Sequence, residues 1–187
     1  MRWFGAFRRQ PGAAPAEELY RAIVLQARQP AFYLACGVAD TPDGRWDLIS
    51  AHAVLVLRRL RRSPEETRAL AQALFDLMFA DMDQNLREMG VGDLAVGKRI
   101  KAMAKGFYGR LAAYDRALSD GDAVAMAAAL RRNVYRNIEP QEEQVAMLAA
   151  YLQREAERLD GSPLASLQAG ELSFGAPPEQ PAARLPA

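Results

Sequence analysis

The sequence holds a single cysteine and a single histidine, Cys36 and His52, among its 187 residues. One thiol cannot form an internal disulfide, and no cluster of cysteines exists for a structural zinc site. This cysteine usage fits a reducing compartment. Long apolar runs are missing too, since none approaches the roughly 18 residues of a membrane-spanning helix. The sequence therefore predicts neither a disulfide scaffold nor a membrane span.

The two ends of the chain lack the patterns of folded or targeting segments. The N-terminal stretch MRWFGAFRRQPG has arginines and aromatics but no continuous apolar core, so it does not resemble a secretory signal. We predict a flexible leader over residues 1–15 and a disordered, proline-rich tail over residues 171–187. Between them we expect one all-α domain over residues 16–170, a length typical of a single domain.

An overall charge bias is absent, because 24 basic residues face 23 acidic ones. This balance argues against a general nucleic-acid binder, and we expect no DNA partner. The distribution is less even: residues 98–136 hold nine Lys or Arg and three Asp. Such a basic region can attract an acidic partner or a membrane surface. The alternative is that these basic residues lie on ordinary solvent-exposed helix faces and bind no partner.

What the sequence does have is helical periodicity. Apolar residues recur every three or four positions over most of the chain, and no convincing strand pattern appears. We predict an all-α single-domain bundle of about six to seven helices. The expected segments are 17–29, 31–38, 45–62, 64–89, 93–118, 122–138, 140–159 and a short turn at 162–168. The segment 31–38 is apolar and short enough to be a strand, but we favour a helix because no partner strand is evident.

The helix over residues 93–118 is expected to be central. One side carries a bulky apolar stripe: Val96, Ile100, Met103, Phe107, Leu111, Tyr114 and Leu118. Another side carries small residues: Ala102, Gly106, Gly109 and Ala113. A glycine inside a helix costs about 1 kcal/mol relative to alanine, and close packing is the usual compensation. We favour core packing on both sides; the alternative for the small side is a groove that receives a partner helix.

Residues that could support catalysis or metal binding are few. His52 lies in an apolar helix, where a hydrogen-bonded core or boundary role is more common than a catalytic or haem-ligand role. Four acidic residues lie near one another in the chain, Asp76, Asp81, Asp83 and Glu88, but their spacing along a helix does not bring them to one point. The stretch from Gly92 to Lys98 imitates a P-loop but lacks the strand and the Ser or Thr. We predict no catalytic residue, no metal site and no cofactor.

Residues 40–118 resemble the ubiquinol–cytochrome c chaperone family. The resemblance begins with DTPDGRWDLISAHAVLVLRRL, and its most specific part is MDQNLREMGVGDLAVGK followed by FYGR and AY. It extends over about residues 19–159. The leader and the tail lie outside it.

The resemblance implies a non-catalytic assembly factor for the respiratory cytochrome bc complex. Its expected partner is newly made cytochrome b, and a small helical partner protein, the ribosome or the membrane surface are further partners that it suggests. The chain lacks an Arg- and Ser-rich transit peptide, so it resembles a bacterial member. We therefore expect a cytoplasmic location, with action at the inner face of the cytoplasmic membrane.

We place the client-binding surface on the second helix of the predicted hairpin and at the turn before it. The residues of this hypothesis are Met89, Val91, Lys98, Lys101, Lys105, Phe107 and Arg110. Two other classes stay open at this point. A peripheral membrane or RNA-binding module would need the basic residues of 98–136 on one exposed face. A small all-α enzyme would need a buried polar pocket near His52 or Asp76.

Overall fold

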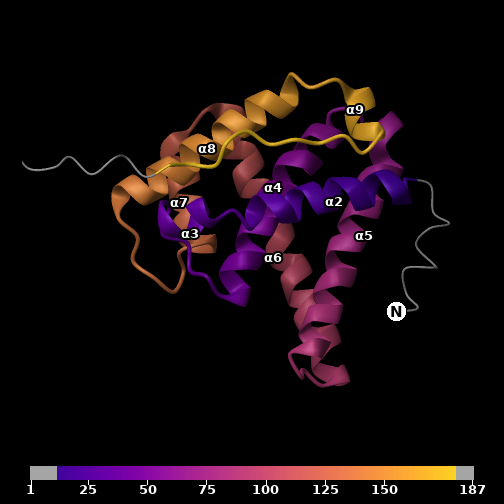
Figure 1. Cartoon of the computed structure of the whole chain (residues 1–187), viewed down its shortest axis with the longest axis horizontal. Coiled ribbons are helices and arrows are strands. Elements are labelled where there is room, and N and C mark those ends of the chain that lie inside the picture. The colour runs from indigo at the N-terminus through magenta and orange to yellow at the C-terminus, as the bar shows by residue number, and fades with distance from the viewer. Residues whose placement is uncertain (1–11, 180–187) are drawn as a thin grey trace, which may run out of the picture.

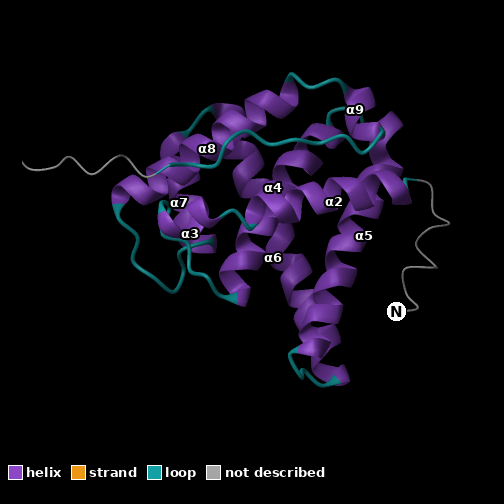
Figure 2. Ribbon diagram, in the orientation of Figure 1, coloured by secondary structure: helices purple, strands orange, loops and turns teal. Residues whose placement is uncertain are grey.

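The structure is a computed structural model, and it describes residues 12–179. These residues form eight helices and no strand (Figures 1 and 2). The helices are α2 (Ala13–Ala27), α3 (Pro30–Leu34), α4 (Pro42–Arg61), α5 (Pro64–Glu88), α6 (Asp93–Asp120), α7 (Ala123–Asn133), α8 (Glu142–Asp160) and α9 (Leu164–Gln168). The prediction of a single all-α domain is confirmed.

Helix α4 is the centre of the bundle and packs against α2, α5, α6 and α8. Its apolar run from Ala53 to Leu57 is buried all round, as the sequence predicts. Helix α6 is less central than expected, because its fully buried core residues, among them Phe107, Leu111 and Tyr114, lie in its second half, while Ile100 and Met103 are only partly buried against the core. The protein is therefore organised around α4.

Two predicted boundaries in the first third of the chain need correction. The turn predicted at residues 40–44 is already the start of α4: the Thr41 hydroxyl accepts a hydrogen bond from the Gly44 amide over 3.2 Å, and Pro42 occupies the first turn. The apolar segment 31–38 is helical only as far as Leu34. It then turns at Gly37, which has a φ of 64°.

The termini also differ from the prediction. Helix α2 begins at Ala13, inside the range predicted as leader; residues 1–11 and 180–187 lie outside the described part of the chain. The tail predicted as disordered from residue 171 has a defined path over residues 171–179, which we call the strap. It runs along α8 and α2 (yellow in Figure 1), and Leu172 and Phe174 pack against the core. The proline content predicts a disordered segment, but apolar contacts and backbone hydrogen bonds to the body hold the strap in place.

Helices α5 and α6 form a hairpin whose far end extends away from the bundle (Figure 1). We call residues 82–105 of this hairpin the arm. Gly90, with a φ of 82°, turns the chain, and the Val91 amide donates to the Leu86 carbonyl over 3.0 Å. Leu86 and Val96 are buried but do not belong to the main core cluster. The arm therefore has a small apolar contact of its own.

An aromatic cluster fixes the base of the arm to the body. Phe75 and Phe79 of α5 have ring centroids 4.6 Å apart, and Phe107 of α6 lies 5.8 Å from Phe75. Trp46 of α4 meets Phe79 edge-on at 5.5 Å. Such offset and edge-to-face pairs add to the gain from burial. They hold α6 in a fixed direction where it leaves the core.

Candidate functional site

The outer face of the arm carries an exposed stripe that combines apolar and basic side chains. Its members follow one another at intervals of four, three, four and three residues, which places them on one side of α6. They are Leu94, Lys98, Lys101, Lys105 and Tyr108, and all are exposed. Leu94 is 98% exposed and Tyr108 is 58% exposed, although the Tyr108 ring stacks on Phe75 at 5.4 Å. The two ends of the basic stripe are therefore apolar.

The lysines of this stripe have no acidic partner within residues 12–179. Lys98, Lys101 and Lys105 form no salt bridge there, whereas Arg87 at the same arm bonds Asp83 and Asp93. Unpaired charges at intervals of three and four residues repel one another slightly. This free positive charge is available to an acidic partner.

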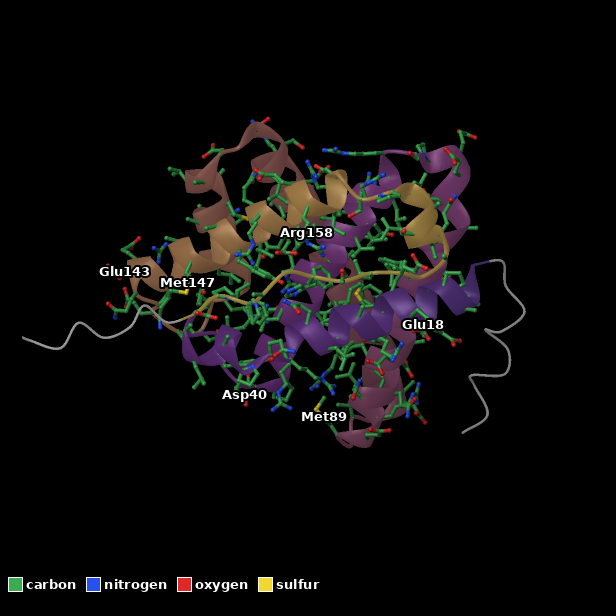
Figure 3. All side chains as sticks on the ribbon, turned by 45° about the horizontal axis from the view of Figure 1, so that its top comes forward. Glu18, Asp40, Met89, Glu143, Met147 and Arg158 are labelled. Carbon is green, nitrogen blue, oxygen red and sulfur yellow. The ribbon has the colours of Figure 1, made fainter. Side chains whose placement is uncertain are left out.

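The tip of the arm adds apolar surface to the stripe. Met89, at the end of α5, is 53% exposed and lies at the far end of the arm (Figure 3). Val91 in the turn is half-buried, and Leu94 follows on α6. Exposed methionine suits contacts with surfaces of variable shape because its side chain is flexible and polarizable.

Two residues of the predicted surface do not lie on it. Phe107 is fully buried in the aromatic cluster, and Arg110 is only 6% exposed. Both fall on the side of α6 that carries Val96 and Tyr114, which is the core side. The Arg110 guanidinium is turned inward by Asp47 of α4, 63 residues away in sequence, over 2.7 Å. Phe107 and Arg110 are therefore removed from the predicted client-binding surface. The role of the other five stays a prediction.

The small-residue side of α6 is exposed as well. Ala102, Gly106 and Gly109 are exposed, and a Cβ atom added at Gly109 would meet nothing within 4 Å, whereas Ala113 is half-buried and packs against the core. The favoured interpretation, core packing on both sides of α6, is therefore wrong for this side. The sequence shows where the small residues lie on the helix but not whether another helix covers them.

The basic residues of 98–136 do not form one free, exposed surface, because Arg110 is buried and several others are paired. Arg110 and Arg136 both bond the buried Asp47, Arg131 pairs with Glu142, and Arg116 lies beside Asp120. Among the described residues of α6, four basic side chains form no salt bridge. They are Lys98, Arg99, Lys101 and Lys105, and all four lie on the arm. An RNA-binding module would need all these basic residues on one exposed face, and the structure does not have such a face among the described residues.

His52 is a hydrogen-bonded core residue, as its sequence context predicts. Its Nδ1 donates to the Leu48 carbonyl over 2.8 Å, so its Nε2 accepts from the Tyr151 hydroxyl over 2.9 Å. Gln26 in turn donates to the same hydroxyl over 2.9 Å. Burial lowers the pKa of His52 to about 4, which keeps the ring neutral. His52 is fully enclosed by the surrounding side chains.

The four acidic residues weighed for a metal site serve separate contacts. Asp81 accepts from the Tyr20 hydroxyl, Asp76 from Gln72, Asp83 from Arg87 and Glu88 from Gln84. Over residues 12–179, no group of three or more His, Cys, Asp or Glu side chains could hold a metal ion. Across the same residues, no helix combines the length and the hydropathy that a bilayer span needs.

The fold and this surface define an all-α protein with a projecting two-helix arm that carries free positive charge. The family model described as Ubiquinol-cytochrome C chaperone matches residues 34–174. The chain belongs to this family, and the resemblance seen in residues 40–118 is thereby confirmed.

Individual relatives agree with the family match. The chain is 26% identical over 146 residues to ubiquinol-cytochrome c reductase complex assembly factor 1 of Mus musculus, covering 78% of this chain and 49% of the mouse protein. The human protein of this name gives the same identity with 48% of its length covered, and the Xenopus laevis protein gives 21% with 72% covered. The chain thus spans about half the length of its mouse and human relatives.

A solved structure covers more of the chain. The crystal structure of the Cbp3 homolog from Brucella abortus matches with a TM-score of 0.80 and 39% identity, over 89% of this chain and 91% of that one. The similarity therefore extends over nearly the whole length of both chains.

Proposed function

We propose that this protein is a chaperone that promotes assembly of the ubiquinol–cytochrome c reductase complex, and that its client is newly made cytochrome b. Membership of the chaperone family supports the first part, as do the relatives, which are named as assembly factors of this complex. The choice of client rests on the resemblance in residues 40–118. The mechanism is holding rather than chemistry. Because cytochrome b is a membrane protein, the proposed place of action is the inner face of the cytoplasmic membrane.

The observation that carries the proposal is the exposed stripe of the arm. A client subunit that has not met its partners exposes apolar helix surface, and Met89 and Leu94 can cover part of it. Covering apolar area contributes about 25 cal/mol per Å². The unpaired Lys98, Lys101 and Lys105 can then attract acidic loops of the client or the headgroups of anionic lipid around it. The stripe therefore offers both a contact area and an attraction for this class of client.

The direct test is charge reversal on the stripe. The triple variant Lys98→Glu, Lys101→Glu and Lys105→Glu should lose most of its capture of cytochrome b in a co-purification from membranes of the host. Its stability should stay close to that of the wild type, because exposed side chains contribute little. A matched control reverses Arg61, Arg68 and Arg132, which are exposed on the body rather than on the arm. Equal capture by both variants would remove the stripe from the proposal.

The assembly role has its own test. Deleting the gene in its host should lower the amounts of cytochrome b and of the assembled complex, measured by haem spectroscopy and native gels. Normal amounts of both would contradict the assembly role. A small helical partner protein and the ribosome are also proposed partners of the stripe. A photo-crosslinker at Leu94 or Tyr108 would separate these from the client, because each gives a product of different mass.

A further inference from the structure

The strap runs between α2 and α8 and has no helix or strand of its own (Figure 1); we call the site that it occupies there the groove. The body holds its backbone at three points. The Gly175 amide donates to Glu155 over 2.8 Å, Gln26 donates to the Gly175 carbonyl over 2.9 Å, and Arg154 donates to the Ala176 carbonyl over 2.5 Å. Side chains that bond consecutive backbone groups are a common means of binding an extended peptide.

The groups that hold the strap are positioned by the body itself. Glu155 is fully buried and bonds Arg154 over 3.1 Å and Arg158 over 2.9 Å (Arg158 is labelled in Figure 3). Gln26 is held by the Tyr151 hydroxyl, and the Arg154 guanidinium lies 5.2 Å from the Tyr151 ring centroid. Helices α2 and α8 thus build the polar part of the groove from their own side chains. A preformed site of this kind loses little entropy when a ligand binds.

One side chain of the strap enters an aromatic recess. The Phe174 ring meets the His52 ring edge-on at 5.1 Å. His52 in turn packs edge-on against Phe32 at 5.3 Å and lies 5.6 Å from Tyr151. Because His52 is neutral, its ring presents an apolar edge to the phenyl group. The recess therefore selects an aromatic side chain.

The next position of the strap is Gly175, and its backbone lies close to the Glu155 carboxylate. A Cβ atom at residue 175 would lie 2.6 Å from Glu155 Oε1. Glu155 cannot move aside easily, because two arginines hold its carboxylate. A larger residue at this position would have to displace the Glu155 carboxylate, which also accepts the bond from the amide. The groove thus selects an aromatic residue followed directly by glycine.

The beginning of the strap has open space on one side, although Leu172 packs against the core. Residues 171–173 border a cleft of about 400 Å³, whose other walls come from α8 and α9. The strap is therefore fixed around Phe174 and Gly175 and again at the buried Pro178, and leaving the groove would break no helix.

We propose that the groove between α2 and α8 is a binding site for an extended peptide that carries an aromatic residue followed by glycine, and that the strap is its intramolecular occupant. An extended segment of a partner protein with this pattern takes the place of the strap. The released strap and the partner segment compete for the same three backbone bonds and the same aromatic recess.

The experiment uses full-length protein and a labelled peptide with the sequence of residues 171–179. The variant Gly175→Val should release the strap and bind the peptide saturably in fluorescence anisotropy. Wild-type protein should bind at least about tenfold more weakly, because its own strap competes at high effective concentration. A peptide with Val in place of its glycine should not bind the variant. Adding Glu155→Gln to Gly175→Val should weaken binding by about tenfold or more.

Circular dichroism and thermal melting report whether each variant is folded. If Gly175→Val does not fold, Phe174→Ala in the full chain replaces it, since this change empties the recess without a clash. A folded variant that shows no saturable binding would overturn the proposal. Failure of both variants to fold would also overturn it, because the strap would then be an integral part of the core.

Discussion

Arg110 of α6 and Asp47 of α4 form a buried ion pair, with 2.7 Å between the guanidinium nitrogen and the carboxylate oxygen. Arg136 bonds the second oxygen of Asp47 over 2.9 Å. Burial raises the pKa of Asp47 to about 7, and the two guanidinium groups oppose this effect. The pair joins α6 to the central helix immediately behind the exposed stripe.

Removing one partner of this pair should be costly. Arg110→Met leaves the buried carboxylate of Asp47 with Arg136 alone and should lower the free energy of unfolding by about 3 kcal/mol. Urea denaturation measures the change. Adding Asp47→Asn should restore part of the loss, because no buried charge is then left underpaired. A single variant within about 0.5 kcal/mol of the wild type would contradict this account.

Because His52 is buried and neutral, we expect the free energy of unfolding to fall at acidic pH. Its pKa is lowered to about 4 in the folded protein from 6.5, so the unfolded chain takes up its proton first. Stability from this residue is therefore present above pH 6.5 and is lost as the pH falls towards 4. The shift corresponds to about 3 kcal/mol. Urea denaturation at pH 7.5 and 4.5 measures it.

The control for this prediction is His52→Gln, which keeps a polar side chain but does not titrate. The difference between wild type and variant cancels the contribution of other titrating groups, Asp47 among them. This difference should shrink as the pH falls. If it is the same at both pH values, His52 does not supply the pH dependence.

The arm should open independently of the body. Leu86 packs within the arm and not in the main core cluster, so Leu86→Ala should destabilise the arm by about 2 kcal/mol or more. Hydrogen exchange should then accelerate over residues 82–105, while α4 and α8 keep their protection. Leu148→Ala, a matched change in the body core, should instead accelerate exchange throughout. Equal acceleration in both variants would mean that the arm and body unfold together.

Gly109 should be replaceable without loss of stability. It lies inside α6 with open space around it, so Gly109→Ala should stabilise the protein by about 0.5–1 kcal/mol in thermal or urea unfolding. Gly44→Ala is the contrasting control: its Cβ atom would lie 2.0 Å from the Ala39 carbonyl oxygen, and destabilisation is expected. If the stabilised Gly109→Ala protein captures less client, the small side of α6 takes part in binding.

Local sequence patterns were sufficient for the elements that depend on neighbours in the chain. The spacing of apolar residues predicts all the longer helices, and Asp122 caps α7 by accepting from the Ala125 amide over 2.9 Å. Gly90, which directly follows a long apolar helix pattern, likewise indicates the turn that ends α5. These features are set by bonds over three to five residues, which a sequence pattern records directly.

Parts of the candidate site could not be predicted in this way. The stripe spacing from Leu94 to Tyr108 is visible in the sequence and could have added both residues to the surface. The burial of Phe107 agrees with its place on the bulky apolar stripe, but that of Arg110 is not visible in the sequence, because it depends on α4 packing against α6. The ion pair with Asp47 bridges 63 residues, and no local pattern records it.

By itself, the sequence determined that this protein is a single all-α domain and that it resembles the ubiquinol–cytochrome c chaperone family, because helix periodicity and family motifs are written in local order. Only the tertiary structure decided which sides of α6 are free, that α4 is the centre, and that the C-terminal strap is seated on Glu155 and Gln26. These outcomes depend on contacts between segments far apart in the chain, whose energies decide which surfaces are covered and which remain for a partner.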